Sequence, residues 1–171
     1  LVRDNYGNVV IAVRQCRSET IVPRDFFYMT ACKSGTARLA AVGDLLLTTP
    51  PGASSPGRGL RALSGEVLDL FSSCDVVLAN LECTLPGKER VAIEPRVFAS
   101  EAQILSLADA CINVVSLANN HAFDAGNEGF EKLTALLDRQ NVRWFGAGLT
   151  LSDALRPCIM DINGIRIALI G

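Results

Sequence analysis

The fold is decided by the stretch Ile112-Asn113-Val114-Val115-Ser116-Leu117-Ala118-Asn119-Asn120-His121-Ala122-Phe123-Asp124-Ala125-Gly126. Its first half is an apolar run rich in β-branched residues, which predicts a buried strand. Two amides and the only histidine of the 171-residue chain follow, and beyond Gly126 the apolar residues share one face of a predicted helix. A buried strand that ends in polar residues and turns into a helix places them at the carboxyl edge of a parallel sheet, where open α/β folds bind ligands.

The segments around this stretch alternate between predicted strands and helices. They are a strand at 38–42, a helix at 60–71, a strand at 75–79, a helix at 101–110, the strand that opens at 112, a helix at 128–139 and a strand at 142–145. This order predicts an α/β fold with a largely parallel sheet and right-handed crossovers. Asn163-Gly164, between the apolar runs 157–162 and 165–170, predicts a hairpin with a type I′ turn. We expect this antiparallel pair to extend the same sheet.

Composition and charge exclude several classes of protein. Hydrophobic residues make up 49% of the chain, charged residues 20%, and the net charge is −2, which is ordinary for a globular protein. Positive residues form no cluster, so we expect no nucleic-acid partner. No apolar run is long enough for a transmembrane segment. The six cysteines show no C-x-x-C spacing and are interpreted as reduced core thiols, which favours the cytoplasm for this chain.

The two ends of the chain are harder to interpret. Residues 1–36 remain an unassigned segment, with candidate strands at 8–13 and 20–29. The chain begins with leucine and stops at Gly171, directly after the apolar run 165–170, so we expect a piece of a longer protein that is incomplete at its C-terminus. The hairpin turn supplies a partner for one edge of this last strand only. We expect the other edge to require a partner from the missing part.

Three predicted strand ends carry residues whose side chains could bind a metal ion or take part in catalysis. Asp44, Glu82 and Asn120 follow one another at intervals of 38 residues, each one strand–helix unit, so they should converge at one edge of the sheet. With His121 they form a donor set for hard or borderline divalent ions. A structural role remains open for His121, as does a helix-capping role for Asp124 or Asn127.

Several spaced motifs in this order resemble one family. They are Ala41-Val42-Gly43-Asp44, Asp75 through Glu82, Val114 through Gly126, Gly146-Ala147-Gly148 and Ala154-Leu155-Arg156-Pro157. They are similar to the CapA family of bacterial poly-γ-glutamate (capsule) biosynthesis proteins, which has a calcineurin-like metallophosphoesterase fold. The resemblance covers residues 39–171. It implies a layered sheet with helices on both faces, and a domain at 37–171 that is the N-terminal half of the family's domain.

The resemblance also implies roles for individual residues. Asp44, Glu82 and Asn120 correspond to metal-binding positions, for two divalent ions drawn from Mn, Mg, Fe or Zn. His121 corresponds to the catalytic histidine beside them. The neighbouring side chains are assigned to substrate binding or to support of the ligands; these are Asn80, Asn119 and Asp124. Leu46 stands where the wider superfamily has a histidine ligand, which questions catalytic competence.

Two functions follow as expectations. The first is a metal-dependent phosphoesterase-type hydrolase of capsule or polyglutamate synthesis, acting on a small-molecule or polymer substrate and inactive as this fragment alone. The alternative is a non-catalytic accessory or binding subunit of a polymer synthase that retains the fold. Either would work with other capsule-synthesis proteins, and the full-length protein could associate with the cell envelope.

Overall fold

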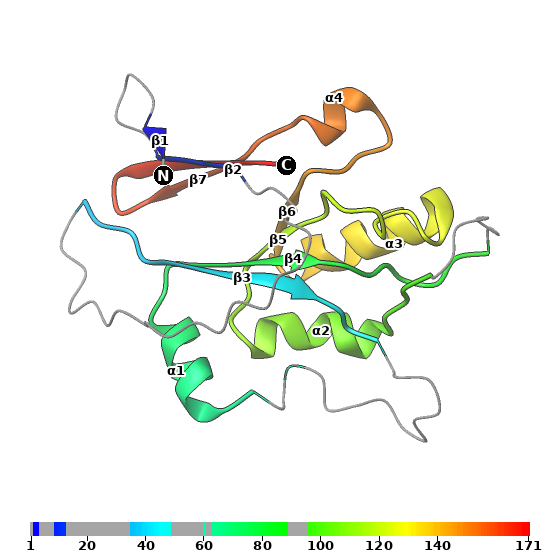
Figure 1. Ribbon diagram of the computed structural model, residues 1–171, viewed down its shortest axis with the longest axis horizontal. Coiled ribbons are helices and arrows are strands. Elements are labelled where there is room, and N and C mark those ends of the chain that lie inside the picture. Colours follow the sequence, from blue (N-terminus) through cyan, green and yellow to red (C-terminus); the bar gives the residue numbers. More distant parts are fainter. Residues whose placement is uncertain (1, 4–8, 13–34, 49–59, 61–62, 89–95) are drawn as a thin grey trace.

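The computed structural model describes residues 2–3, 9–12, 35–48, 60, 63–88 and 96–171 (Figure 1). The strands are β1 (Val2–Arg3), β2 (Val9–Ala12), β3 (Leu39–Leu45), β4 (Val76–Leu81), β5 (Val114–Ser116), β6 (Arg143–Phe145), β7 (Cys158–Ile162) and β8 (Ile165–Ile170). The helices are α1 (Gly65–Ser72), α2 (Glu101–Asp109), α3 (Gly126–Arg139) and α4 (Leu151–Ala154). The predicted α/β class is confirmed. The candidate strand at 20–29 lies outside the described residues.

The first sheet is parallel throughout, in the order β3-β4-β5-β6. Its carboxyl edge therefore collects the ends of all four strands, as the alternation of strands and helices predicts. The pairing of β3 with β4 shifts register between Ala41 and Asp44, which sets Asp44 directly beside Asn80. Asn80 in turn pairs with Ser116 of β5. The register thus aligns the polar ends of three strands.

The predicted hairpin is present, but it belongs to a second sheet. β7 and β8 are antiparallel, and both turn residues, Asn163 (φ 51°) and Gly164 (φ 81°), have the positive φ that a type I′ turn requires. The strand order is β1-β2-β8-β7, so the expectation that this pair extends the parallel sheet is wrong. The second edge of β8 also has a partner, because β2 pairs with it in parallel, Val9 opposite Ile167. The expected gap at that edge is filled by a strand from the first twelve residues.

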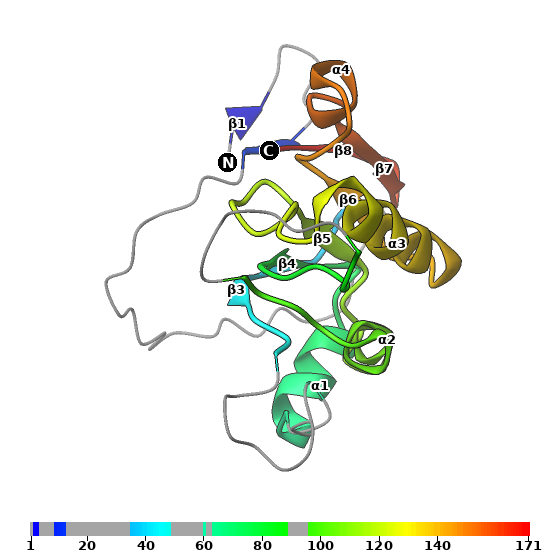
Figure 2. The same cartoon turned by 90° about the vertical axis from the view of Figure 1, so that its right-hand side faces the viewer.

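The two sheets and the helices form three layers (Figures 1 and 2). In β4, Val77 and Ala79 point into the apolar cluster that contains the buried faces of α1, α2 and α3. Val76 and Leu78 point the opposite way, into a cluster with Met160, Ile167 and other residues of β7 and β8. Helices were expected on both faces of the parallel sheet; α1, α2 and α3 cover one face, and the second sheet covers the other. Residues of β4 are buried on both sides, as in other central parallel strands.

The helix boundaries follow from capping chemistry. α1 begins at Gly65, later than its apolar stripe predicts, because Ser64 accepts a hydrogen bond from the Val67 N–H and caps the helix. Ser100 and Gln103 form a reciprocal capping box at the start of α2. The short helix α4, which the sequence did not predict, is capped by Thr150. Among the described residues, no helix is long and apolar enough to cross a membrane.

Gly129 provides a test of how tightly α3 packs against the loop after β4. A Cβ at this position would lie 2.6 Å from the Leu85 carbonyl oxygen and would also meet Ala125 Cβ. We expect Gly129→Ala to lower the free energy of unfolding by about 1–3 kcal/mol through overpacking. The matched control is Gly65→Ala, where no atom lies within 4 Å and the helix should be unchanged or slightly stabilised. Urea unfolding of both variants makes the comparison, and equal stabilities would contradict the packing described here.

Candidate functional site

A hydrogen-bond network joins the ends of β3 and β4. The side-chain nitrogen of Asn80 donates to Asp44 Oδ1 at 2.8 Å and to Glu82 Oε1 at 3.1 Å. Asp44 is exposed, whereas Asn80 and Glu82 are buried, with exposed fractions of 8% and 7%. Two carboxylates thus meet at a single amide nitrogen. Like charges this close repel each other, and a bound cation would relieve that repulsion.

Asn119, beyond the end of β5, fixes which way the Asn80 amide faces. Its Nδ2 donates to the Leu81 carbonyl oxygen at 2.9 Å and to Asn80 Oδ1 at 3.1 Å, and its Oδ1 accepts the His121 backbone N–H at 3.0 Å. Because one partner is a backbone acceptor and the other a backbone donor, only one orientation of Asn119 satisfies both. Asn80 must then present its oxygen to Asn119 and its nitrogen to the carboxylates. The network therefore assigns Asn80 to holding the acids together.

His121 is held by a buried carboxylate. Asp124 has no exposed surface, and its Oδ2 accepts the Val97 N–H at 2.6 Å and lies 2.8 Å from His121 Nδ1. Since a carboxylate accepts hydrogen bonds, Nδ1 carries a proton and Nε2 is the basic nitrogen of the ring. Asp124 does not cap α3, whose start has no side-chain cap; Gly126, at φ 65°, makes the turn into that helix. The capping alternative for Asp124 is therefore wrong.

The structure links most of the predicted site residues. One chain of contacts runs through Asp44, Glu82, Asn80, Asn119, His121 and Asp124. Asn120 is exposed and adjacent to this chain in sequence. Behind the site, burial raises the pKa of the Cys83 thiol to about 12, so this cysteine is protonated at neutral pH and belongs to the core. The roles of Asp44, Glu82 and Asn120 as metal ligands, and of His121 as catalyst, remain predictions.

The donor set is suited to a hard divalent cation. It offers carboxylate oxygens from Asp44 and Glu82, the ligand type that such ions prefer. Within the described segments, no group of three or more His, Cys, Asp or Glu residues is placed to hold a metal ion. Amide oxygen from Asn120 or water would therefore have to complete the coordination of an ion between the two acids. The two carboxylates suit such an ion, and a metal site at this place remains a prediction.

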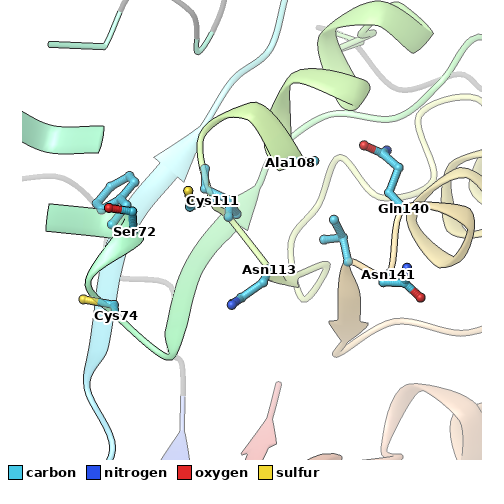
Figure 3. A pocket seen from close by; sticks show the side chains of 10 residues that line it. Ser72, Cys74, Ala108, Cys111, Asn113, Gln140 and Asn141 are labelled. Atoms are coloured by element: carbon cyan, nitrogen blue, oxygen red, sulfur yellow. The ribbon is translucent and has the colours of Figure 1, made fainter. Parts of the chain in front are cut away.

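Two pockets lie at opposite edges of the parallel sheet. One, of about 490 Å³, adjoins the site and includes Leu46, Arg96 and Val97 in its lining. The other, of about 340 Å³, lies at the opposite edge of the parallel sheet, where Cys74, Cys111 and Gln140 contribute to it (Figure 3). The sequence did not indicate a role for Val97. This residue acts through its backbone N–H, a group that every residue except proline carries.

The geometry defines an α/β domain with a polar site at the carboxyl edge of its parallel sheet. The chain belongs to the bacterial capsule synthesis protein family PGA_cap, whose profile matches residues 38–171. It is 27% identical over 134 residues to the PGA biosynthesis protein CapA of Bacillus subtilis (strain 168), covering 76% of this chain and 35% of that protein. It is 29% identical over 73 residues to the capsule biosynthesis protein CapA of Bacillus anthracis, covering 43% of this chain and 18% of that protein. The chain thus spans about a third or less of these relatives.

Proposed function

We propose that the full-length protein is a metal-dependent phosphoesterase-type hydrolase that acts in capsule polymer synthesis. The observation that supports this most is the contact of two carboxylates with the single Asn80 nitrogen, next to a histidine oriented by a buried acid. The family supports a place in capsule synthesis. Asp44 and Glu82 would hold two divalent ions with Asn120. A bound divalent ion would supply an activated water and offset charge on a phosphoryl group.

The protein's own residues would contribute orientation and proton transfer. Asn80 keeps the Asp44 and Glu82 carboxylates together, and Asn119 fixes Asn80. His121 has a side chain only 13% exposed, and its Nδ1 is engaged by Asp124. In its protonated form, Nε2 can donate a proton to the leaving oxygen or stabilise charge on the phosphoryl group. Asp124 contacts His121 Nδ1 and prevents the ring from turning away.

A non-catalytic accessory subunit is the second candidate, and one feature favours it. Leu46, two residues after Asp44, is 53% exposed and brings no donor atom to the place where the wider superfamily has a ligand histidine. Such a subunit would retain the fold and the network while assisting a polymer synthase. Metal binding separates the two functions, because the hydrolase depends on Glu82 as a ligand.

Glu82→Gln in the full-length protein tests the proposal. It keeps the shape of the side chain and removes its charge, so we expect the affinity for Mn²⁺ to fall about tenfold or more. Glu131→Gln is the matched control, because Glu131 is an exposed acid on α3 whose side chain takes no part in the site contacts described above. Calorimetric titration with Mn²⁺ measures both variants. Equal affinities in wild type and Glu82→Gln would contradict the hydrolase and favour the accessory subunit.

A further inference from the structure

Gly146 follows β6 directly, at the carboxyl edge of the parallel sheet, and its backbone lies against Ala118. A Cβ at Gly146 would lie 2.6 Å from Ala118 Cβ and 3.1 Å from the Ala118 backbone nitrogen. Gly146 also has a φ of 85°, in the region that favours glycine. Two separate properties therefore disfavour a side chain at this position, the backbone conformation and the contact with Ala118.

The second sheet brings another glycine to the same methyl group. Gly171 follows β8, and a Cβ on it would lie 2.7 Å from Ala118 Cβ and 2.8 Å from Gly146 Cα. Backbone from both sheets thus approaches Ala118 closely. Backbone atoms in a packed interior cannot rotate away as the end of a long side chain can, so these contacts limit where the loop after β5 can lie.

Hydrogen bonds fix the loop after β5 to its neighbours. Leu117 N–H donates to the Phe145 carbonyl oxygen at 2.8 Å, and Asn119 N–H donates to the Leu117 carbonyl oxygen at 2.9 Å. Ser116 Oγ accepts the Ala118 N–H at 3.2 Å. The place of Asn119 therefore depends directly on that of Ala118, the residue before it in the chain.

A side chain at Gly146 would disturb the contacts that Asn119 makes. Carbon atoms reach their optimal separation at about 3.5 Å, so a Cβ now 2.6 Å from Ala118 Cβ would require a displacement of about 0.9 Å. Asn119 Nδ2 donates to Asn80 Oδ1 at 3.1 Å, close to the upper limit of a good hydrogen bond. A displacement of that size passed on to Asn119 would break this bond.

We propose that Gly146 is a positioning residue of the candidate site, which keeps Ala118 where Asn119 can hold the Asn80 amide toward the two acids. Gly146 acts through Ala118 and Asn119, and Asn80 then brings the carboxylates of Asp44 and Glu82 together. The proposal rests on the proposed function in one respect, that these two acids bind a metal ion. The effect on Asn119 requires no metal and can be measured without one.

Gly146→Ala in the full-length protein is the first test. In the metal-free protein, we expect it to shift the ¹H–¹⁵N NMR signals of the Asn80 and Asn119 side-chain amides, because the bond between them is lost. The affinity for Mn²⁺ should fall about three- to tenfold, the effect of losing one neutral hydrogen bond. Gly164→Ala is the matched control, since its φ is 81° and no atom lies within 4 Å of the added Cβ. It introduces the same backbone strain without the contact and should leave both measurements as in wild type.

Ala118→Gly distinguishes positioning from a general loss of stability. It removes the methyl group that an added Cβ would meet, so Gly146→Ala should have little further effect on the amide signals or on Mn²⁺ affinity in an Ala118→Gly background. Thermal unfolding shows whether each variant is folded. Gly171→Ala replaces Gly146→Ala if that variant is unfolded, because its Cβ approaches the same methyl group from β8.

The outcomes separate this proposal from the proposed function. Unchanged Asn119 amide signals in folded Gly146→Ala, or the same shift in Gly164→Ala, overturn the positioning role. It is also overturned if Gly146→Ala has the same effect with and without the Ala118 methyl group, or is unfolded and Ala118→Gly does not restore its folding. Mn²⁺ titration of wild type and Glu82→Gln reports on the proposed function alone. Shifted amide signals without Glu82-dependent metal binding would retain the role of Gly146 and reject the hydrolase.

Discussion

His121→Asn is expected to lower kcat of the Mn²⁺-loaded full-length protein toward bis(4-nitrophenyl) phosphate by about 10²–10⁴-fold, the usual contribution of a positioned acid–base group. The side chain of asparagine can still contact Asp124, but it has no group that titrates near neutral pH. The Mn²⁺ affinity should change little, because the two carboxylates and the Asn80 bridge remain.

Two further measurements show whether a change in kcat reflects lost catalysis rather than lost folding or lost metal binding. A thermal unfolding scan establishes that the His121→Asn protein is folded, and calorimetry establishes that it binds Mn²⁺. A folded, metal-binding variant with wild-type kcat would show that His121 has a structural role, the alternative that a lone histidine always leaves open.

Asp124→Ala is expected to cost about 2–4 kcal/mol in the free energy of unfolding, since it removes a buried acceptor and leaves the Val97 N–H without its partner. Asp124→Asn provides the sharper comparison. Its oxygen can still accept the Val97 N–H, so much of the stability should be retained. Its amide would then donate toward His121 Nδ1 and move the ring proton to Nε2, which reverses the donor and acceptor positions of the imidazole.

Comparing Asp124→Asn with Asp124→Ala distinguishes a role of Asp124 in positioning His121 from a purely structural role. We expect Asp124→Asn to lower kcat by about 10–100-fold with little change in KM, and to alter the pH profile of kcat. Asp69→Ala, a surface acid on α1, is the control and should stay within about 0.5 kcal/mol of wild type. A wild-type pH profile in Asp124→Asn would contradict the assignment of Asp124 as the residue that orients His121.

The sequence predicts those parts of the fold that depend on local patterns. The order of strands and helices, the Asn163-Gly164 turn and the meeting of Asp44, Asn80 and Glu82 at one sheet edge all follow from periodicity and spacing. The second sheet does not, because the pairing of β2 with β8 joins residues far apart in the chain and is specified by no local signal. The register shift between Ala41 and Asp44, which brings Asp44 beside Asn80, is equally invisible in the composition of β3.

The candidate site shows the same division between local and distant information. Residue type and position at a strand end indicate which side chains can act. Only the family resemblance implied a supporting role for Asn119 and Asp124, and the structure places both in contact with His121. Residue type and position do not reveal that Asn80 donates to both acids, since the direction of an amide depends on the whole network. They also miss Val97 and the pocket beyond it, because a backbone N–H carries no residue signature.

The parallel pairing of β2 with β8 has a consequence for how the chain acquires its structure. Val9 pairs with Ile167, so β2 cannot form this pairing until the chain has been synthesised as far as Ile167. At a synthesis rate of about 5–20 residues per second, that delay is roughly 8–30 s on the ribosome. Closing so long a loop is slow in refolding as well, because its entropy is lost before the pairing contacts form. The parallel sheet can assemble first, and the β1-β2-β8-β7 sheet is therefore the later of the two sheets to become native.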